Sequence, residues 1–177
     1  INAALKLQGR EPMILDRASS YIGTLVDDLV TKGCSEPYRM MTSRSEYRLI
    51  LRQDNAADRL LPVGHRVGLV SEERFQKFLD EKKICEQELE RIKSVTIHPS
   101  EKLNLLLREK GTSEITAGVR MIELLKRPQV DYTDLAEFDP GRPTMKYSLV
   151  NKLEIELKYS GYIKIQQEQI EKMRRLE

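Results

Sequence analysis

Residues 71–94, SEERFQKFLDEKKICEQELERIKS, indicate the fold class of this chain. Positions suited to face a core recur at alternating steps of three and four residues, which is the spacing of one face of an α-helix. Ser71 is a favourable N-cap, so the stretch predicts a helix of about six turns. A polar or weakly apolar residue at two of these positions argues against a free-standing coiled coil. The stripe consists of Phe75, Phe78, Lys82, Cys85, Leu89 and Ile92.

Further helices are predicted on both sides of this stretch. A short one is expected from Asp54 or Asn55 through Leu61. After residue 98 the sequence predicts helices at 100–110, where Gly111 ends the helix, at 119–127, and for one or two turns at 131–138. Residues 139–143 are expected to be a loop.

The last segment, 148–177, gives two signals. Residues 153–159 alternate apolar and charged side chains like a half-buried strand, whereas 163–173 have helical spacing. No partner strand is evident, and a lone strand leaves its edges unpaired. One long helix through Gly161 is therefore favoured, and a strand at 152–160 stays open as the alternative.

The composition is that of a globular protein without a reaction centre of its own. The 177 residues are 40% hydrophobic and 33% charged, with a formal net charge of +2. No membrane span or export signal is present, so a cytoplasmic location is expected. Cys34 and Cys85 fit neither a CxxC pair nor a zinc framework, which predicts reduced thiols and no metal site. Phosphate-binding and hydrolase motifs are also missing, so no catalytic or cofactor-binding residue is assigned.

Three segments are expected along the chain. Residues 1–33 are too short to have a core and are interpreted as the tail or linker of a preceding domain. Residues 34–98 form a first helical subdomain, and 99–177 form a second helical segment that ends in a long helix. Because the chain starts at Ile1, in a helical pattern without a cap, we expect a piece of a longer protein. The predicted fold class is mostly α, a multi-helical domain with a short N-terminal remnant.

Residues 36–59, EPYRMMTSRSEYRLILRQDNAADR, carry the functional signal. Ser43 followed by Glu46 fits the capping box, which predicts a helix that starts at Arg44. Arginines four residues apart on such a helix share one face. That face would contain Arg44, Arg48 and Arg52, with Arg39 just before it.

The choice of arginine over lysine is informative. Between Gly33 and Gln76 there are seven arginines and no lysine. A guanidinium grips phosphate at two points and stacks on bases, which an ammonium does not. Tyr38 and Tyr47 lie among these arginines, and aromatic rings can stack on unpaired bases. The pattern predicts a nucleic acid or another polyanion as ligand. The alternative is a solvated face, or arginines paired with nearby acids, and tyrosines in the core.

Residues 21–60, YIGTLVDDLVTKGCSEPYRMMTSRSEYRLILRQDNAADRL, resemble the start of the C-terminal region of the MnmG (GidA) family. HPSEKLN at 98–104, LLKRPQV at 124–130 and LEIELKYSGYIKIQQEQIEKM at 153–173 are similar to the segments that follow in the family. INAA at 1–4 resembles the close of the family's FAD-binding domain. The resemblance implies a tRNA-modifying flavoenzyme of which this chain is the helical part.

The resemblance also implies cofactors and partners. FAD would lie in an N-terminal domain outside this chain, with NADH as reductant and a folate as one-carbon donor. The parent enzyme would add a carboxymethylaminomethyl group to C5 of the tRNA wobble uridine. It would act as a homodimer with the GTPase MnmE (TrmE), which docks through a region after Glu177. This chain alone is not expected to be active.

Six residues are expected to bind tRNA. Arg39 and Arg48 occupy the family's EPYR and EYR positions, and the resemblance implies a role in tRNA binding and activity for both. Arg44, in TSR, and Lys32 lie close to them, while Arg52 and Tyr47 come from the charge and aromatic pattern. The alternative function is a protein interaction module, in which these arginines pair with acids on the FAD domain, a second subunit or MnmE.

Overall fold

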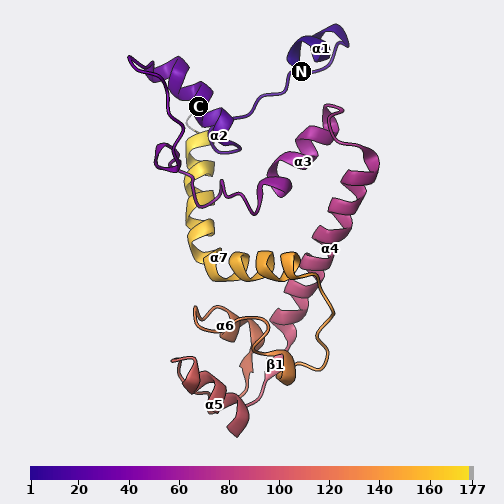
Figure 1. The fold of residues 1–177 in the computed structure, drawn as a ribbon, viewed down its shortest axis with the longest axis vertical. Helices are drawn as coiled ribbons and strands as arrows, with labels where there is room; N and C mark the ends of the chain where they lie inside the picture. Colours follow the sequence, from indigo (N-terminus) through magenta and orange to yellow (C-terminus); the bar gives the residue numbers. More distant parts are fainter. Residues whose placement is uncertain (176–177) are drawn as a thin grey trace. The chain divides into compact units, whose positions relative to one another are not determined.

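The computed structural model describes residues 1–175 and is built mainly from α-helices (Figure 1). The mostly α fold predicted from the sequence is confirmed. The helices are α1 (Asn2–Leu7), α2 (Tyr21–Asp27), α3 (Ala56–Arg66), α4 (Glu72–Ser94), α5 (Glu101–Glu109), α6 (Met121–Leu125) and α7 (Tyr147–Arg174). A π-helical segment η1 (Asp28–Lys32) extends α2, and short 3-10 turns form η2 (Thr42–Arg44) and η3 (Ala136–Phe138).

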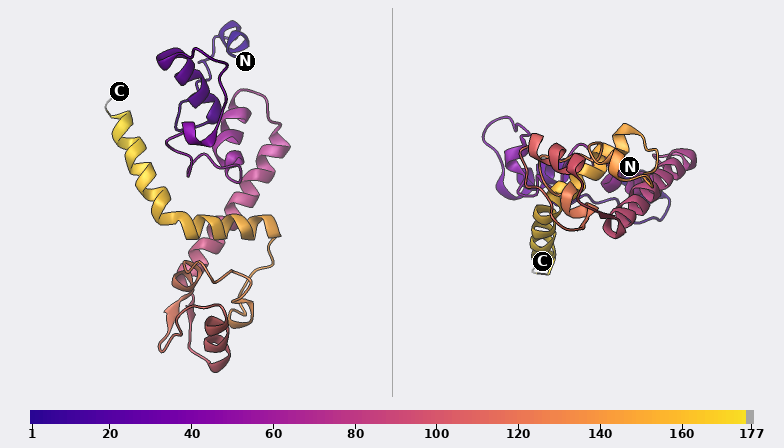
Figure 2. Two further views of the ribbon diagram at one scale, coloured as in Figure 1. Left: turned by 60° about the vertical axis from the view of Figure 1, so that its left-hand side comes forward. Right: turned by 90° about the horizontal axis from the view of Figure 1, so that it is seen from below.

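The chain forms two compact units, and the path of each can be followed in Figure 2. Unit 1 contains Ile1–Phe78 and the described residues from Tyr162 onward, whereas unit 2 contains Leu79–Gly161. Unit 1 therefore joins the beginning of the chain to its end. Unit 2 is one continuous segment.

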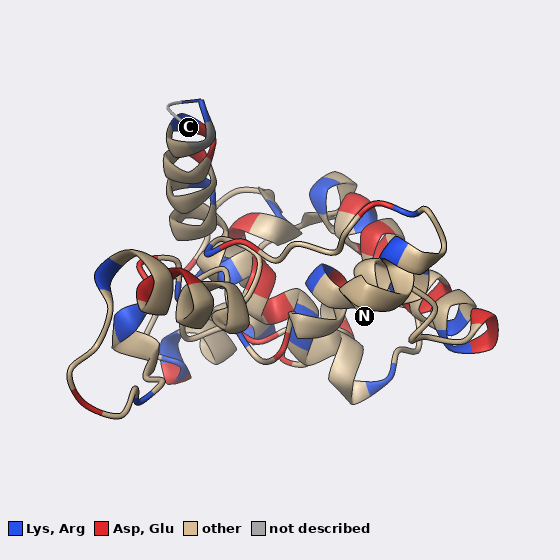
Figure 3. Cartoon of the chain, turned by 90° about the horizontal axis from the view of Figure 1, so that it is seen from above, with Lys and Arg blue, Asp and Glu red and all other residues tan. Residues whose placement is uncertain are grey.

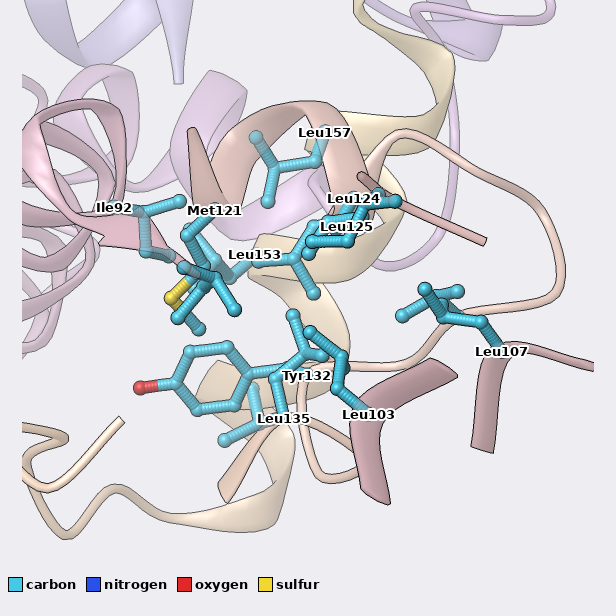
Figure 4. Packing of buried hydrophobic residues seen from close by; sticks show 14 residues of the cluster. Ile92, Leu103, Leu107, Met121, Leu124, Leu125, Tyr132, Leu135, Leu153 and Leu157 are labelled. Carbon is cyan, nitrogen blue, oxygen red and sulfur yellow. The ribbon is translucent and has the colours of Figure 1, made fainter. Parts of the chain in front are cut away.

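Unit 2 has a single apolar core (Figure 4). Helix α5 begins where Ser100 Oγ accepts a hydrogen bond from Leu103 N at 3.2 Å, and Gly111 follows it with φ +70°. The same unit contains a two-stranded antiparallel sheet, β1 (Thr96–Ile97) with β2 (Val119–Arg120). The buried residues are Ile92, Ile97, Leu103, Leu107, Ile115, Met121, Leu124, Leu125, Val130, Tyr132, Leu135, Val150, Leu153 and Leu157.

A buried charged cluster connects α4 to the loop after η3. Arg91 donates to both carboxylate oxygens of Glu88 at 2.7 and 2.8 Å, and its third nitrogen donates to Asp139 at 2.9 Å. The hydroxyl of Tyr132 donates to Glu88 at 2.6 Å. Burial, and then this hydrogen bond, raises the pKa of Tyr132 to about 12. These hydrogen bonds join α4 to the segment that follows it within unit 2.

Unit 1 has a smaller core made from distant parts of the chain. Tyr47 and Leu51 pack with Ile170, and the Tyr47 hydroxyl lies 3.0 Å from the sulfur of Met173. The side-chain amide of Gln166 also donates to the Glu46 carbonyl at 3.0 Å. The end of α7 therefore completes the environment of residues 46–51.

Several predicted helices are confirmed. Helix α4 begins directly after Ser71, and its Phe78, Cys85 and Ile92 are buried while Lys82 is exposed. Helix α5 occurs as expected. Residues 147–174 form one helix through Gly161, so the strand alternative at 152–160 is wrong. The helix expected from Asp54 or Asn55 also exists as α3, although it continues past Pro62 to Arg66.

The helix predicted from Arg44 to Arg52 is wrong. Residues 42–44 form one 3-10 turn, and 46–50 form a further turn without a continuing helix. The capping box fails because the Glu46 carboxylate is held by Arg17 instead of turning back to the Ser43 backbone. Arg44, Arg48 and Arg52 therefore do not line one helical face. The helix predicted at 119–127 is also shorter than expected, because its first two residues pair as β2.

Candidate nucleic-acid interface

The predicted arginines lie on a largely exposed segment between η1 and α3. Gly33 begins it with φ +66°, a left-handed conformation that glycine adopts without strain. Segments with Lys or Arg and segments with Asp or Glu are intermixed over the chain (Figure 3). Charge density alone does not distinguish arginines that could bind a ligand from arginines that support the fold. The contacts of each side chain make this distinction.

Arg17 is the centre of the ion pairs that support this segment. Its side chain is 14% exposed and donates to Asp27 at 2.8 Å, to Asp28 at 2.6 Å and to Glu46 at 2.9 and 2.8 Å. The loop that carries Arg17 packs tightly on α2, because a Cβ at Gly23 would collide with the carbonyl of Asp16. The hydrogen bonds to Glu46, opposed by burial and assisted by the two aspartates, raise the pKa of Arg17. Arg17 is therefore a fixed structural cation.

Asp28 connects Arg17 to the exposed segment. Its carboxylate accepts hydrogen bonds from Lys32 at 2.9 Å, from Arg17 at 2.6 Å and from the Tyr38 hydroxyl at 2.7 Å. These donors, Lys32 first, hold the pKa of Asp28 well below its usual range. The Asp28 side chain is 5% exposed, so a buried carboxylate fixes the position of the Tyr38 ring.

Arg44 lies over that ring. Its guanidinium carbon is 4.5 Å from the centroid of Tyr38, and its Nε donates to the carbonyl of Arg39 at 3.0 Å. Arg44 is nonetheless exposed. A cation at this distance from an aromatic face is attracted by the ring quadrupole. Arg44 is therefore both held in place and open to solvent.

The structure separates the six predicted residues into four groups, of which Arg52 alone is the fourth. Arg39, Arg44 and Arg48 are exposed, and within residues 1–175 their guanidinium groups form no ion pair. Lys32 is also exposed but pairs with Asp28. Tyr47 is buried at 5% exposure and packs in the core of unit 1, so its ring is not accessible to a base.

Arg52 belongs with the structural arginines. It donates to Asp54 at 3.1 Å and to the Leu49 carbonyl at 2.5 Å, and its side chain is 18% exposed. Arg59 similarly donates to the carbonyls of Ser19 and Arg52 at 2.5 and 3.0 Å, and burial lowers its pKa. Both arginines cap backbone carbonyls of unit 1 and have few donors left for a ligand.

Sequence reasoning missed Arg17 and Asp28. Both stand in a stretch without a motif, and nothing local distinguishes Asp28 from Asp27. The spacing of Asp28 and Lys32 is a signal in the sequence that could have indicated the role of Asp28, because residues four apart on a helix can form an ion pair.

In residues 1–175 no group of three or more His, Cys, Asp or Glu side chains is arranged to bind a metal ion. Within the same residues neither Cys34, which is exposed, nor Cys85, which is buried, is in a disulfide. None of the described helices has the length and apolar character needed to cross a bilayer.

Known proteins resemble this chain along its whole length. Residues 72–167, more than half of the chain, match the family model of the tRNA modifying enzyme MnmG/GidA C-terminal helical domain. Over 177 residues the chain is 56% identical to the tRNA uridine 5-carboxymethylaminomethyl modification enzyme MnmG of Caldicellulosiruptor saccharolyticus, and 50% identical to that of Clostridium botulinum strain Loch Maree. Each match covers all of this chain, and the chain spans only 28% of the length of each relative.

A solved structure supports the same relationship. GidA from Aquifex aeolicus in its form II crystal matches with a TM-score of 0.82 and 35% sequence identity, over 99% of this chain and 27% of that one. The family resemblance of residues 21–60 is thus confirmed by sequence and by fold, and the chain belongs to the MnmG/GidA family.

Proposed function

We propose that this chain binds tRNA through an arginine loop, defined as Arg39, Arg44 and Arg48, while another part of the protein modifies the wobble uridine. One observation carries the proposal. These arginines are exposed and form no ion pair within residues 1–175, whereas Arg17 and Arg52 are largely buried and paired. Arginine forks free of acidic partners are the usual ligands of nucleic-acid phosphates. The relatives are named as tRNA modification enzymes, which supports the choice of tRNA.

The remaining predicted residues have different parts in this proposal. Lys32 lies at the edge of the loop and adds positive charge near the bound phosphates, although its ammonium also supports Asp28. Arg52 and Tyr47 shape the loop from within unit 1, through Asp54 and Met173 respectively. We therefore retain Lys32 as a secondary contact and assign no direct contact to Arg52 or Tyr47.

The flavin chemistry is assigned to a part of the protein outside this chain. Dinucleotide cofactors bind where a parallel sheet meets a glycine-rich helix start. In residues 1–175 the sheet consists of two antiparallel strands of two residues each, so these residues do not fit FAD. We propose that FAD, with NADH and a folate, acts elsewhere in a cytoplasmic enzyme, and that this chain supplies RNA binding.

Protein contacts are a second role, at a different surface. Along α2 and η1, Ile22, Val26 and Val30 are 60%, 54% and 79% exposed. An exposed apolar patch of this kind is typical of a surface that packs on another protein surface. We assign contacts with the remainder of the protein, a second subunit or the GTPase MnmE to this patch, and tRNA to the arginine loop.

The experiment compares two triple variants of the intact protein. Arg39→Ala, Arg44→Ala and Arg48→Ala are combined in one variant, and the control combines Arg74→Ala, Lys77→Ala and Lys83→Ala on α4. Binding of labelled tRNA is measured at several salt concentrations. Each lost phosphate contact lowers the slope of log affinity against log salt by about one unit. The proposal fails if the arginine-loop variant keeps the affinity and slope of the unmodified protein.

A further inference from the structure

The contacts of Arg44 differ from those of the other two arginines in the loop. Its guanidinium carbon lies over the Tyr38 ring, 4.5 Å from the centroid, and the Arg39 carbonyl accepts from its Nε at 3.0 Å. The Arg44 carbonyl in turn accepts from Arg17 at 3.5 Å. An exposed arginine normally samples many rotamers, and ordering it costs entropy. Here that ordering is already present without a ligand.

The ring beneath Arg44 is anchored as well. The Tyr38 hydroxyl donates at 2.7 Å to Asp28, whose side chain is 5% exposed and ion-paired with Arg17 at 2.6 Å. Burial, and then the bond to Asp28, raises the pKa of Tyr38, so the hydroxyl keeps its proton and remains a donor. A continuous series of contacts therefore runs from the buried Arg17 and Asp28 through Tyr38 to Arg44.

We propose that the Arg44–Tyr38 pair is a stacking site for one unpaired nucleobase of the bound RNA, and this rests on the proposed function. A planar guanidinium has two faces, and the guanidinium carbon of Arg44 lies over the Tyr38 ring. Arg44 is exposed and has no other side-chain partner within residues 1–175, which leaves room for a second planar group against its guanidinium. Unpaired RNA bases stack on guanidinium planes as they do on aromatic rings.

A base fits this site better than a phosphate does. Phosphate is gripped by the nitrogen edge of the fork, and part of that edge, Nε, is already used by the Arg39 carbonyl. Within residues 1–175 no hydrogen bond occupies the guanidinium edge of Arg39 or Arg48, which suits phosphate contacts. The loop thus combines two phosphate ligands with one stacking platform, and the platform selects a looped-out base over a paired one.

The test replaces arginine by lysine, which keeps the charge and removes the plane. In the intact protein, Arg44→Lys is expected to bind an anticodon stem-loop RNA about tenfold more weakly, with an unchanged salt slope. With 2-aminopurine in the loop of the RNA, quenching on binding is expected to fall. Arg48→Lys is the matched control, and its affinity is expected to stay within about twofold because a lysine still contacts phosphate.

A second variant protects the test against misfolding at Arg44. Tyr38→Leu removes the platform but not the charge, and it is expected to lose the same quenching. Combined with Arg44→Lys it should add little, because residues that act as one unit are non-additive. Wild-type affinity and quenching in either single variant overturn the stacking site. If those variants bind normally while the triple alanine variant does not, only this inference is lost; if the triple variant also binds normally, the tRNA proposal is lost as well.

Discussion

Arg17 donates one hydrogen bond to each carboxylate oxygen of Glu46, at 2.9 and 2.8 Å, across 29 residues of chain. This two-point contact replaces the capping box that residues 43–46 would otherwise form. It also fixes the start of the arginine loop against α2, through the second contact of Arg17 with Asp28. The position of the exposed arginines therefore depends on a buried one.

Replacing Arg17 by alanine is expected to destabilise the protein by about 2 kcal/mol, because hydrogen-bonded charges at Asp28 and Glu46 lose their partner. The melting temperature, followed by circular dichroism, measures the effect. Arg48→Ala, which removes an exposed arginine, is the control and is expected to change it little. Equal melting temperatures for the two variants would contradict the supporting role of Arg17.

Stability is expected to fall in mild acid. The pKa of Asp28 is held below its ordinary 3.8 by Lys32, Arg17 and Tyr38, and Arg17 lowers the pKa of Glu46 from 4.5. Both groups bind protons more readily in the unfolded chain, so their contribution is complete at neutral pH. It is lost as the pH falls below about 4.5, the ordinary pKa of a glutamate.

The melting temperature is measured between neutral pH and about pH 3. The unmodified protein is compared with a double variant that combines Asp28→Asn and Glu46→Gln. The variant is expected to be less stable at neutral pH and to lose less stability on acidification. Parallel curves for the two proteins would mean that these carboxylates do not carry the pH dependence.

Arg48 and Arg52 are predicted to differ although each belongs to the same predicted helix face. Arg52 pairs with Asp54 and the Leu49 carbonyl, whereas Arg48 has no ion pair within residues 1–175. Arg52→Ala is expected to lower the melting temperature and leave the salt slope of tRNA binding unchanged. Arg48→Ala is expected to lower the slope by about one unit at constant stability. The assignment of the two arginines would be wrong if Arg52→Ala lowered the salt slope and Arg48→Ala lowered the melting temperature.

Leu103 and Leu105 provide a matched pair on α5. Leu103 is fully buried in the core of unit 2, and Leu105 is 49% exposed. Leu103→Ala is expected to cost about 2–5 kcal/mol in unfolding free energy, because it leaves a cavity. Leu105→Ala is expected to cost less than about 1 kcal/mol. Chemical denaturation measures both, and a similar loss for the two variants would contradict the inward orientation of Leu103.

Local signals were sufficient for most helices. Helix α4 and helix α5 each begin at a serine whose hydroxyl accepts from the backbone, and α5 ends at a glycine with positive φ. Such signals act within one turn of the chain, so a sequence displays them directly. The long helix α7 was harder to predict, because the apolar and charged residues at 153–159 alternate as in a strand. The lack of a partner strand in the sequence favoured a helix, and the helix is confirmed.

The arginine loop could be predicted in composition but not in shape. Glu46 and Tyr47 satisfy the helical pattern, yet their partners are Arg17, 29 residues away, and Met173, 126 residues away. Tertiary contacts of this length override local propensity. The family motif identified Arg39, Arg44 and Arg48, but only the contacts of the folded chain separated them from Arg52.

The joining of Tyr47 to Met173 has a consequence for synthesis. Unit 2 is one continuous stretch and can fold as soon as it leaves the ribosome, whereas the core of unit 1 lacks Ile170 and Met173 until the end of α7 emerges. Those partners are separated by 126 residues, which at typical elongation rates corresponds to roughly 6 to 25 seconds. During that interval Tyr47 and Leu51 lack their contacts with α7 in the nascent chain, so the segment that carries the arginine loop acquires its native surroundings later than unit 2 does.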